Sequence, residues 1–426
     1  MALIFNFLFG FSLILRVLSL EQCLQIDSNE IAETLQCGNF TAKLGLYYEN
    51  FLEITCNNNV DLSIFDYNLI FKKNITYAER RNIIFINCTI LESTNFKNIV
   101  QHINNDIGLN IIQILEFSQS NKIILSQYNL ELFKNLDYLT IENCNQLKVK
   151  PHALDKLQLI SVIKFQKIKL ILFSREIFQK LQNLESIYLV NINLARIPRG
   201  LFHGLTKLTL INLKNNVLTT INDEDFSTQI NLIDLILENN KLTKISKNFF
   251  KSNQLETINL KGNNIKYLDD KIFNNQSNLI DLDLSDNKFQ MISKNLLNGL
   301  EKLWILSFEN NEINLIDDNA FNDLSALRHL KLGHNKLTTI PKNFFHGLKK
   351  LKVLTLEENK LKTLDNLSSQ ILPDLKKLDL SHNQLNGIPD NFLNKLSNMK
   401  YYNLENNNFF IVIDKLRQLK YVQDTD

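Results

Sequence analysis

Leucine and isoleucine recur at fixed intervals along most of the chain. In the stretch that starts at Leu208, apolar residues occupy positions 1, 4, 6, 11 and 14 of a frame, Asn216 is at position 9, and Phe226 is at position 19. The frame repeats every 24 residues, with a single step of 23, and its first residues are Leu136, Ile160, Leu184, Leu208, Leu232, Leu255, Leu279, Leu303, Leu327, Leu351, Leu375 and Met399. A weaker frame starts at Ile112, and an earlier one contains Ile83, Phe85, Cys88 and Ile90. A repeat architecture is therefore the prediction on which all others depend.

Each frame predicts one short strand. Positions 4 and 6 are apolar and position 5 varies, which is typical of a strand that buries every second side chain. A single repeat cannot bury its apolar side, so neighbouring repeats must stack and share one core. We therefore expect a parallel sheet along one side of the stack, with wider connections on the other side that make the sheet side concave.

Two further columns run through the frames. Position 9 is predicted to be a ladder of buried amides that bond backbone groups where the chain leaves the sheet: Asn216, Asn240, Asn263, Asn287, Asn311, Asn335, Asn359, Asn383 and Asn407. Because the chain has only 11 Gly and 5 Pro, we expect these asparagines to make its turns. Position 19 is predicted to be a core column of Phe178, Phe202, Phe226, Phe250, Phe273, Phe321 and Phe345, with Leu297 and Leu393 as substitutes.

The frame resembles the leucine-rich repeat in the 24-residue form common in extracellular proteins, L-x-x-L-x-L-x-x-N-x-L-x-x-I-P-x-x-x-F-x-x-L, with prolines in place at Pro198, Pro341 and Pro389. The resemblance covers most of the chain. It implies an α/β solenoid, a horseshoe with a parallel β-sheet on its concave face and an irregular or short helical convex side. The chain looks most like animal, particularly insect, secreted repeat proteins and receptor ectodomains. This implies a non-enzymatic protein of innate immunity, adhesion or extracellular matrix.

All five cysteines lie in the first third of the chain. Cys88 and Cys144 occupy position 9, where the family also allows cysteine, so we expect both to be buried and reduced. Cys23, Cys37 and Cys56 are then the disulfide candidates of an N-terminal cap, and Cys37–Cys56 is the pairing we favour, although the spacing does not fix it. The odd count leaves one thiol free or bonded to another chain, so a homodimer or heterodimer stays open.

The N-terminus and the sequons predict secretion. Residues 3–15 form an apolar run of signal-peptide length, too short for a membrane helix. Sequons occur at Asn39, Asn74, Asn87, Asn275 and Asn366. We therefore divide the chain into a signal peptide (1–20), a cysteine-containing cap (21–79), degenerate repeats (80–135), repeats of about 24 residues (136–413) and a short tail or capping helix (414–426). We expect no membrane span.

Charge and motifs narrow the function classes. A net charge of +2 disfavours nucleic acid as a partner. No phosphate-binding or dinucleotide-binding fingerprint occurs, so we expect no cofactor. We also expect no metal, because His329 and His334 have no evident carboxylate partner in the sequence. Asp283, Ser307 and His329 superficially suggest a hydrolase triad, but an open sheet offers neither a pocket nor oxyanion donors, so we expect no catalysis.

The exposed positions 2, 3, 5, 7 and 8 are the predicted surface for a protein or glycan partner. Trp304, the only tryptophan, is a hot-spot candidate between an acidic zone (Asp234, Glu238, Asp281, Asp283, Asp286) and a basic zone (Arg328, His329, Lys331, His334). The predicted contact residues are Tyr188, Asp234, Asp281, Asp283, Trp304, His329, Lys331 and Tyr401. One alternative for this surface stays open: the charges are merely solvated and Trp304 packs on a neighbouring side chain. For the function, an inhibitor or decoy and a structural matrix component also stay open.

Overall fold

The computed structural model describes residues 23–28, 32–37, 40–45, 51–56, 82–91, 94, 112–172, 174–247, 249–250, 255–364, 374–389, 392 and 399–409. The chain divides into two compact units, Met1–Asn193 (unit 1) and Leu194–Asp426 (unit 2). Several predictions lie outside the described residues: the signal peptide, the sequons Asn39, Asn74 and Asn366, Leu393 and the tail from residue 414.

Unit 1 begins with antiparallel strands and continues with parallel ones. Strands β1 (Cys23–Ser28), β2 (Ala32–Cys37), β3 (Phe40–Gly45) and β4 (Phe51–Cys56) pair antiparallel in chain order. A parallel sheet then runs from β4 through β5 (Asn82–Ile86), β6 (Ile114–Ser118), β8 (Tyr138–Glu142), β10 (Val162–Gln166) and β12 (Ser186–Val190). The antiparallel strands therefore extend one end of the repeat sheet.

A second parallel sheet in unit 1 consists of β7 (Lys122–Leu125), β9 (Gln146–Val149) and β11 (Leu170–Leu172). These strands start at position 11 of their frames, and they end at position 14 in β7 and β9 and at position 13 in β11. Among the described residues, α4 (Gln127–Leu130) is the one complete helix. The Ser126 side chain caps it by accepting a hydrogen bond from the Asn129 N–H.

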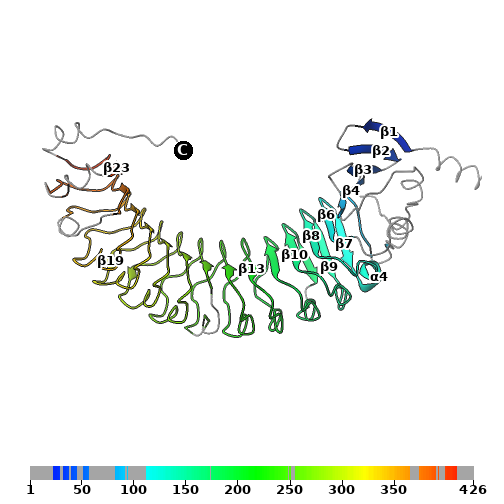
Figure 1. Cartoon of the computed structure of the whole chain (residues 1–426), viewed down its shortest axis with the longest axis horizontal. Coiled ribbons are helices and arrows are strands. Elements are labelled where there is room, and N and C mark those ends of the chain that lie inside the picture. Colours follow the sequence, from blue (N-terminus) through cyan, green and yellow to red (C-terminus); the bar gives the residue numbers. More distant parts are fainter. Residues whose placement is uncertain are drawn as a thin grey trace, which may run out of the picture. The chain divides into compact units, whose positions relative to one another are not determined.

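Unit 2 contains nine described three-residue strands in one parallel sheet: β13 (Leu210–Asn212), β14 (Asp234–Ile236), β15 (Thr257–Asn259), β16 (Asp281–Asp283), β18 (Ile305–Ser307), β20 (His329–Lys331), β21 (Val353–Thr355), β22 (Lys377–Asp379) and β23 (Tyr401–Asn403). Every pair is in frame register, since position 3 of one repeat faces position 3 of the next. A small second sheet joins β17 (Met291–Ile292) to β19 (Leu315–Ile316). In Figure 1 the nine strands follow one side of unit 2 and the returning loops follow the other.

The apolar positions form the core, as predicted. At positions 1, 4 and 6 of one repeat, Leu303 and Leu306 are fully buried, and so is Phe308. The described position-19 rings are also buried, and neighbours stack, with ring centroids 5.6 Å apart for Phe202 and Phe226. Since each buried side chain removes apolar surface from water in the space between two repeats, burial holds neighbouring repeats together.

The asparagine ladder is confirmed. Asn287 donates through Nδ2 to Leu260 O of the preceding repeat at 2.9 Å and to two carbonyls of its own repeat. Its Oδ1 accepts the Ile265 N–H, which is at position 11 of the preceding repeat, at 3.1 Å. One amide therefore satisfies backbone groups of two repeats at the place where the chain leaves the sheet.

The turn itself is made at position 8, not position 9. Position 8 has a positive φ in each described repeat, for example 53° at Asn239, 53° at Asp286 and 50° at Glu358. Asparagine and glycine tolerate this left-handed backbone better than other residues. The Asn-Asn pairs therefore combine two roles, since the first residue makes the turn and the second bonds the backbone.

One cysteine prediction is confirmed and two are wrong. Cys144 is a free, buried thiol, as predicted, and burial raises its pKa. Cys88, however, forms a disulfide with Cys56, which also rules out the Cys37–Cys56 pairing. The reason is that β4 lies directly beside β5, so that Cys56, the last residue of β4, reaches Cys88, which lies two residues after the end of β5. The backbone register places Cys23 opposite Cys37 in the β1–β2 pair.

Candidate functional site

The exposed strand positions of unit 2 form a continuous surface, which we call the strand face: frame positions 2, 3, 5, 7 and 8 of its repeats. Strand pairing brings Asp281 and His329 into one row at position 3, with Ile305 between them. The neighbouring row at position 5 contains Asp283, Ser307 and Lys331, and these side chains lie on the same face because residues two apart in a strand point the same way.

The acidic zone is partly neutralised at its margin. Glu238 pairs with Lys214 at 2.9 Å, and Asp286 pairs with Lys261 at 3.3 Å. In the centre, burial raises the pKa of Asp281, the Asp283 charge raises it further, and Lys331 lowers it. The predicted acidic and basic zones therefore interact electrostatically and are not separate patches.

Trp304 is exposed but not isolated. Its side chain is 44% exposed, and the guanidinium of Arg328, from the same position in the next repeat, lies 4.3 Å from the ring centroid. This is a cation–π contact. The alternative that Trp304 packs on a neighbouring side chain thus describes part of its environment, while nearly half of its surface stays available.

A row of cations continues from Trp304. At position 2 each N–H donates to the same position of the preceding repeat: Arg328 to Trp304 O at 2.9 Å, and Lys352 to Arg328 O at 2.8 Å. Lys376 and Lys400 continue the row at 2.9 Å and 3.1 Å. Strands in a sheet are about 4.8 Å apart, so four positive side chains are closely spaced. We call Arg328, Lys352, Lys376 and Lys400 the basic row; the prediction of the basic zone included only its first member.

The residues of the suspected triad have other environments. Asp283 Oδ1 accepts hydrogen bonds from the backbone N–H and hydroxyl of Ser285, at 2.9 Å and 2.5 Å. Ser307 is 6% exposed and its hydroxyl oxygen accepts the Glu309 N–H at 3.4 Å. Burial lowers the pKa of His329, and the charges of Lys331, Lys352 and Arg328 lower it further. No hydrogen bond joins these three side chains to one another in the described part of the chain.

The two predicted tyrosine contacts lie far apart in the sequence and belong to different units. Lys377 Nζ lies 4.8 Å from the ring centroid of Tyr401 in unit 2, and Lys164 Nζ lies 5.2 Å from that of Tyr188 in unit 1. Asp234, on β14, is half-buried. The structure therefore groups Asp281, Asp283, Trp304, His329 and Lys331 on or next to adjacent strands of unit 2, and Tyr188 belongs to unit 1.

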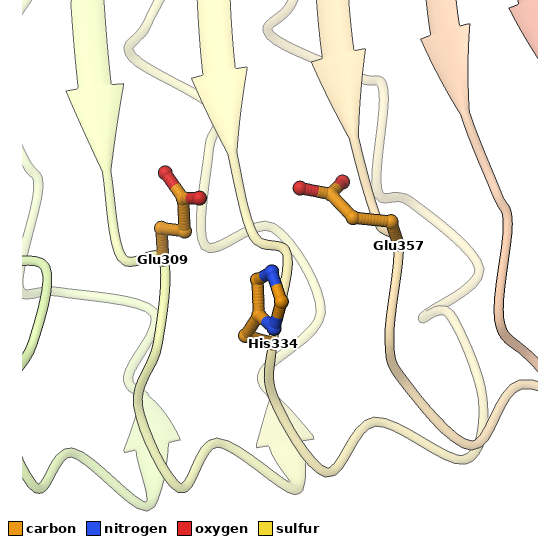
Figure 2. A group of neighbouring side chains, drawn as sticks. All are labelled: Glu309, His334 and Glu357. Atoms are coloured by element: carbon orange, nitrogen blue, oxygen red, sulfur yellow. The ribbon is translucent and has the colours of Figure 1, made fainter.

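A group of possible metal ligands was missed in the sequence. One atom each of Glu309, His334 and Glu357 lies within 4.8 Å of the other two (Figure 2). The residues occupy positions 7, 8 and 7 of three successive repeats. The sequence signal for this group is the pair of carboxylates that flank His334 at position 7 of the neighbouring repeats, and it lies outside the columns at positions 3 and 5.

Two sequons fall on described residues. Asn275 is exposed. Asn87 makes a turn with φ 57°, and its Nδ2 donates to Cys56 O at 2.8 Å. A glycan on Asn87 would therefore have to be compatible with this bond beside the disulfide. In the part of the chain that the structure describes, no helix has the length and apolarity needed to cross a lipid bilayer.

Two family models match the chain, and both describe leucine-rich repeats. Residues 305–361, 327–385 and 349–409 match the family "Leucine rich repeat", and residues 123–248 and 195–328 match "BspA type Leucine rich repeat region (6 copies)". Together these matches extend over residues 123–409, which is about two thirds of the chain. No curated protein matches the sequence.

Solved structures share the fold. A leucine-rich repeat protein of Leptospira interrogans is 24% identical, with TM-score 0.66, and the alignment covers 80% of this chain and 82% of that one. Toll of Drosophila, in its complex with Spatzle, is 19% identical, with TM-score 0.61, over 93% of this chain and 60% of that one. The TLR13–ssRNA13 complex gives 20% identity and TM-score 0.62, over 83% and 54%.

Proposed function

The chain belongs to the leucine-rich repeat family, and from this premise we propose that it is a secreted, non-catalytic module that binds a protein partner through the strand face of unit 2. Members of this family are generally binding modules rather than enzymes. The Toll–Spatzle complex is a case in which a structurally similar chain binds a protein.

The observation that carries the proposal is the placement of Trp304 at one end of the basic row. A half-exposed tryptophan next to an arginine has the composition of an interface hot spot. The four cations of the basic row favour a partner with an acidic patch, since complementary charge steers association and fixes register. The strand face therefore combines an apolar anchor with a charged region beside it.

The partner proposed is a protein rather than a nucleic acid. Asp281, Asp283 and Glu357 share the strand face with the basic row, and acidic groups would repel a phosphate backbone. Net charge over the whole chain is only +2. The single-stranded RNA in the TLR13 complex makes this alternative worth an explicit control.

Three features support an extracellular location. Cys56 and Cys88 form a disulfide, and disulfides persist mainly in oxidising compartments. Residues 3–15 have the length and apolarity of a signal-peptide core, and the sequons add the acceptors for N-linked glycans. Within this location, recognition in innate immunity, adhesion or the matrix is the proposed role, and a secreted inhibitor or decoy is the second candidate.

The test is partner capture with matched variants. The full chain and its variants are immobilised, exposed to extracts of the tissue that produces the protein, and crosslinked before mass spectrometry. Trp304→Ala and Lys352→Glu should each reduce capture and weaken the purified partner's affinity at least tenfold. Tyr267→Ala is the control, because Tyr267 is an aromatic residue that is 70% exposed and lies at position 13, outside the strand face.

Equal affinity for Trp304→Ala and the unmodified protein would remove the strand face from the proposal. Tight binding of single-stranded RNA with a steep salt dependence would instead support the nucleic-acid alternative. Gel electrophoresis without reductant shows in the same samples whether a cysteine links two chains.

A further inference from the structure

Gly333 interrupts the column of side chains at position 7. The flanking repeats carry Glu309 and Glu357 at this position. A Cβ atom added at Gly333 would collide with the carboxylate of Glu357, so this carboxylate occupies the space that a side chain at 333 would fill. The backbone is held in register here, because the Asn310 N–H donates to Gly333 O at 2.9 Å and the His334 N–H donates to Glu357 O at 2.8 Å.

His334 is oriented towards the two carboxylates. Its φ of 54° belongs to the position-8 turn that recurs in every described repeat. Its Nδ1 lies 3.1 Å from Glu358 Oε2, which leaves Nε2 as the nitrogen for a further ligand. Figure 2 shows the ring between Glu309 and Glu357 with one nitrogen towards them. A carboxylate on one imidazole nitrogen and a metal on the other is the usual arrangement around metal-bound histidines.

The Glu357 carboxylate is only partly compensated. Its Oε2 is buried and has no hydrogen-bond partner in the described part of the protein. Burial raises the pKa of Glu357, and a hydrogen bond from its own backbone lowers it; the charges of Asp379 and Glu309 raise it further, and His334 lowers it. Leaving a carboxylate oxygen buried and unpaired is costly, and a bound cation would remove that cost.

We propose that Glu309, His334 and Glu357 bind a divalent transition-metal ion, for which Zn²⁺ is the best fit. One imidazole nitrogen with two carboxylates is a donor set that Zn²⁺ accepts, whereas Ca²⁺ and Mg²⁺ prefer sites made of oxygen alone. The three ligands come from three successive repeats, so the ion would cross-link them on the strand face. Glu309 and His334 also line a hollow of about 230 Å³, so at least one coordination position stays accessible. This site does not depend on the proposed partner.

Calorimetry with ZnCl₂ tests the proposal. The full chain is freed of metal with chelator and titrated, in parallel with His334→Asn and Glu357→Gln. His334→Asn removes the imidazole but keeps a residue suited to positive φ, so the turn is preserved. We expect one saturable site in the unmodified protein, and at least a tenfold loss of affinity in either variant.

His382→Asn is the matched control. His382 occupies position 8 with φ 53°, but its Nε2 lies 3.1 Å from Asn406 Nδ2, and among the described residues it belongs to no group of three possible metal ligands. This variant should bind Zn²⁺ like the unmodified protein. Three results would overturn the proposal: no saturable zinc binding, equal zinc affinity in His334→Asn, or tighter binding of Ca²⁺ than of Zn²⁺.

Discussion

The two units satisfy the same backbone requirement in different ways. In unit 2, position 9 is asparagine in all nine repeats and the strands are three residues long. In unit 1, the same position is Cys88, Ser120, Cys144, Ile168 and Ile192, and the strands of the repeats are five residues long. A second sheet of three strands, β7, β9 and β11, also follows in unit 1.

The difference begins where the chain leaves the sheet. In unit 2 the N–H at position 11 donates to the position-9 asparagine of the next repeat. For example, the Leu337 N–H donates to Asn359 Oδ1 at 3.0 Å. In unit 1 no amide is present at position 9, and the same stretch pairs backbone to backbone, with Lys122 opposite Gln146. Buried N–H groups must be bonded in either case, so a side-chain ladder and an additional sheet are alternative solutions to one problem.

The largest effect is expected from breaking the covalent link in unit 1. Cys56→Ser with Cys88→Ser should destabilise this unit by about 3–4 kcal/mol, since the disulfide closes a sequence separation of 32 residues in the unfolded chain. Hydrogen exchange should accelerate in β4 and β5 and stay unchanged in unit 2. Reductant should also accelerate exchange in β4 and β5 of the unmodified protein; equal protection with and without the Cys56–Cys88 bond would contradict the expectation.

The ladder itself is compared by substituting position 9 in both units. Asn287→Ala should cost about 1–3 kcal/mol, because backbone groups of two repeats lose their partners. Cys144→Ala should cost only about 1 kcal/mol, because it deletes a thiol from a site whose backbone is paired by the second sheet. Urea unfolding, followed for each unit by hydrogen exchange, measures both. Equal losses would show that the amide has no special role.

A smaller effect is expected at position 8, which is lysine in one repeat of unit 1. Lys167 is exposed and has φ 52°. Lys167→Asn should stabilise unit 1 by roughly 0.5–1 kcal/mol, because asparagine tolerates the left-handed backbone better. Lys169→Asn, at an exposed site nearby, is the control and should give no gain in stability. A gain in both variants would mean that replacing lysine by asparagine stabilises the unit independently of the turn.

The smallest effect concerns pH and has opposite signs in the two units. In unit 1, burial raises the pKa of Glu116 above 4.5, Glu142 and Glu53 raise it further, and Lys164 lowers it. The folded state then binds the proton more tightly than the unfolded state. Stability from this group therefore increases as the pH falls through the raised pKa towards 4.5. Relative to Glu116→Gln, the unmodified protein should gain thermal stability as the pH falls from 7 to 5.

In unit 2, burial lowers the pKa of His329 below 6.5, with Lys331, Lys352 and Arg328 lowering it further. The unfolded state then binds the proton more tightly, so stability is lost as the pH falls through 6.5 towards the folded pKa. Relative to His329→Gln, the unmodified protein should lose stability over the same range. Melting curves at pH 7 and pH 5 check both directions, and a shift of the same sign in both would contradict the assignments.

The sequence predicted the repeating core because its period is local and redundant. Leu306, Asn287 and Phe226 each have counterparts 24 residues away, so their burial followed from the pattern alone. The Cys56–Cys88 bond was not predictable in this way, because it depends on β4 lying beside β5, and β4 belongs to a region without the period. The second sheet of unit 1 was also missed, because it forms where position 9 has no asparagine amide to bond the backbone.

The candidate site was predicted only in part. The column at position 3 placed Asp281 and His329 on one face, as the structure has them. The metal-ligand group was missed, because Glu357 approaches His334 only where Gly333 leaves space, and this depends on an absent side chain. The contact of Trp304 with Arg328 depends on side-chain rotamers, which the repeat pattern of the sequence does not specify.

The ladder has a direction with a consequence for synthesis. Asn311 accepts from the Phe289 N–H and donates to Leu284 O, and both partners lie in the preceding repeat. Each turn therefore lacks part of its bonding until the following turn has been made. A nascent chain leaving the ribosome can close unit 2 one turn at a time, in the order in which the turns are translated, with the newest turn always the least secured.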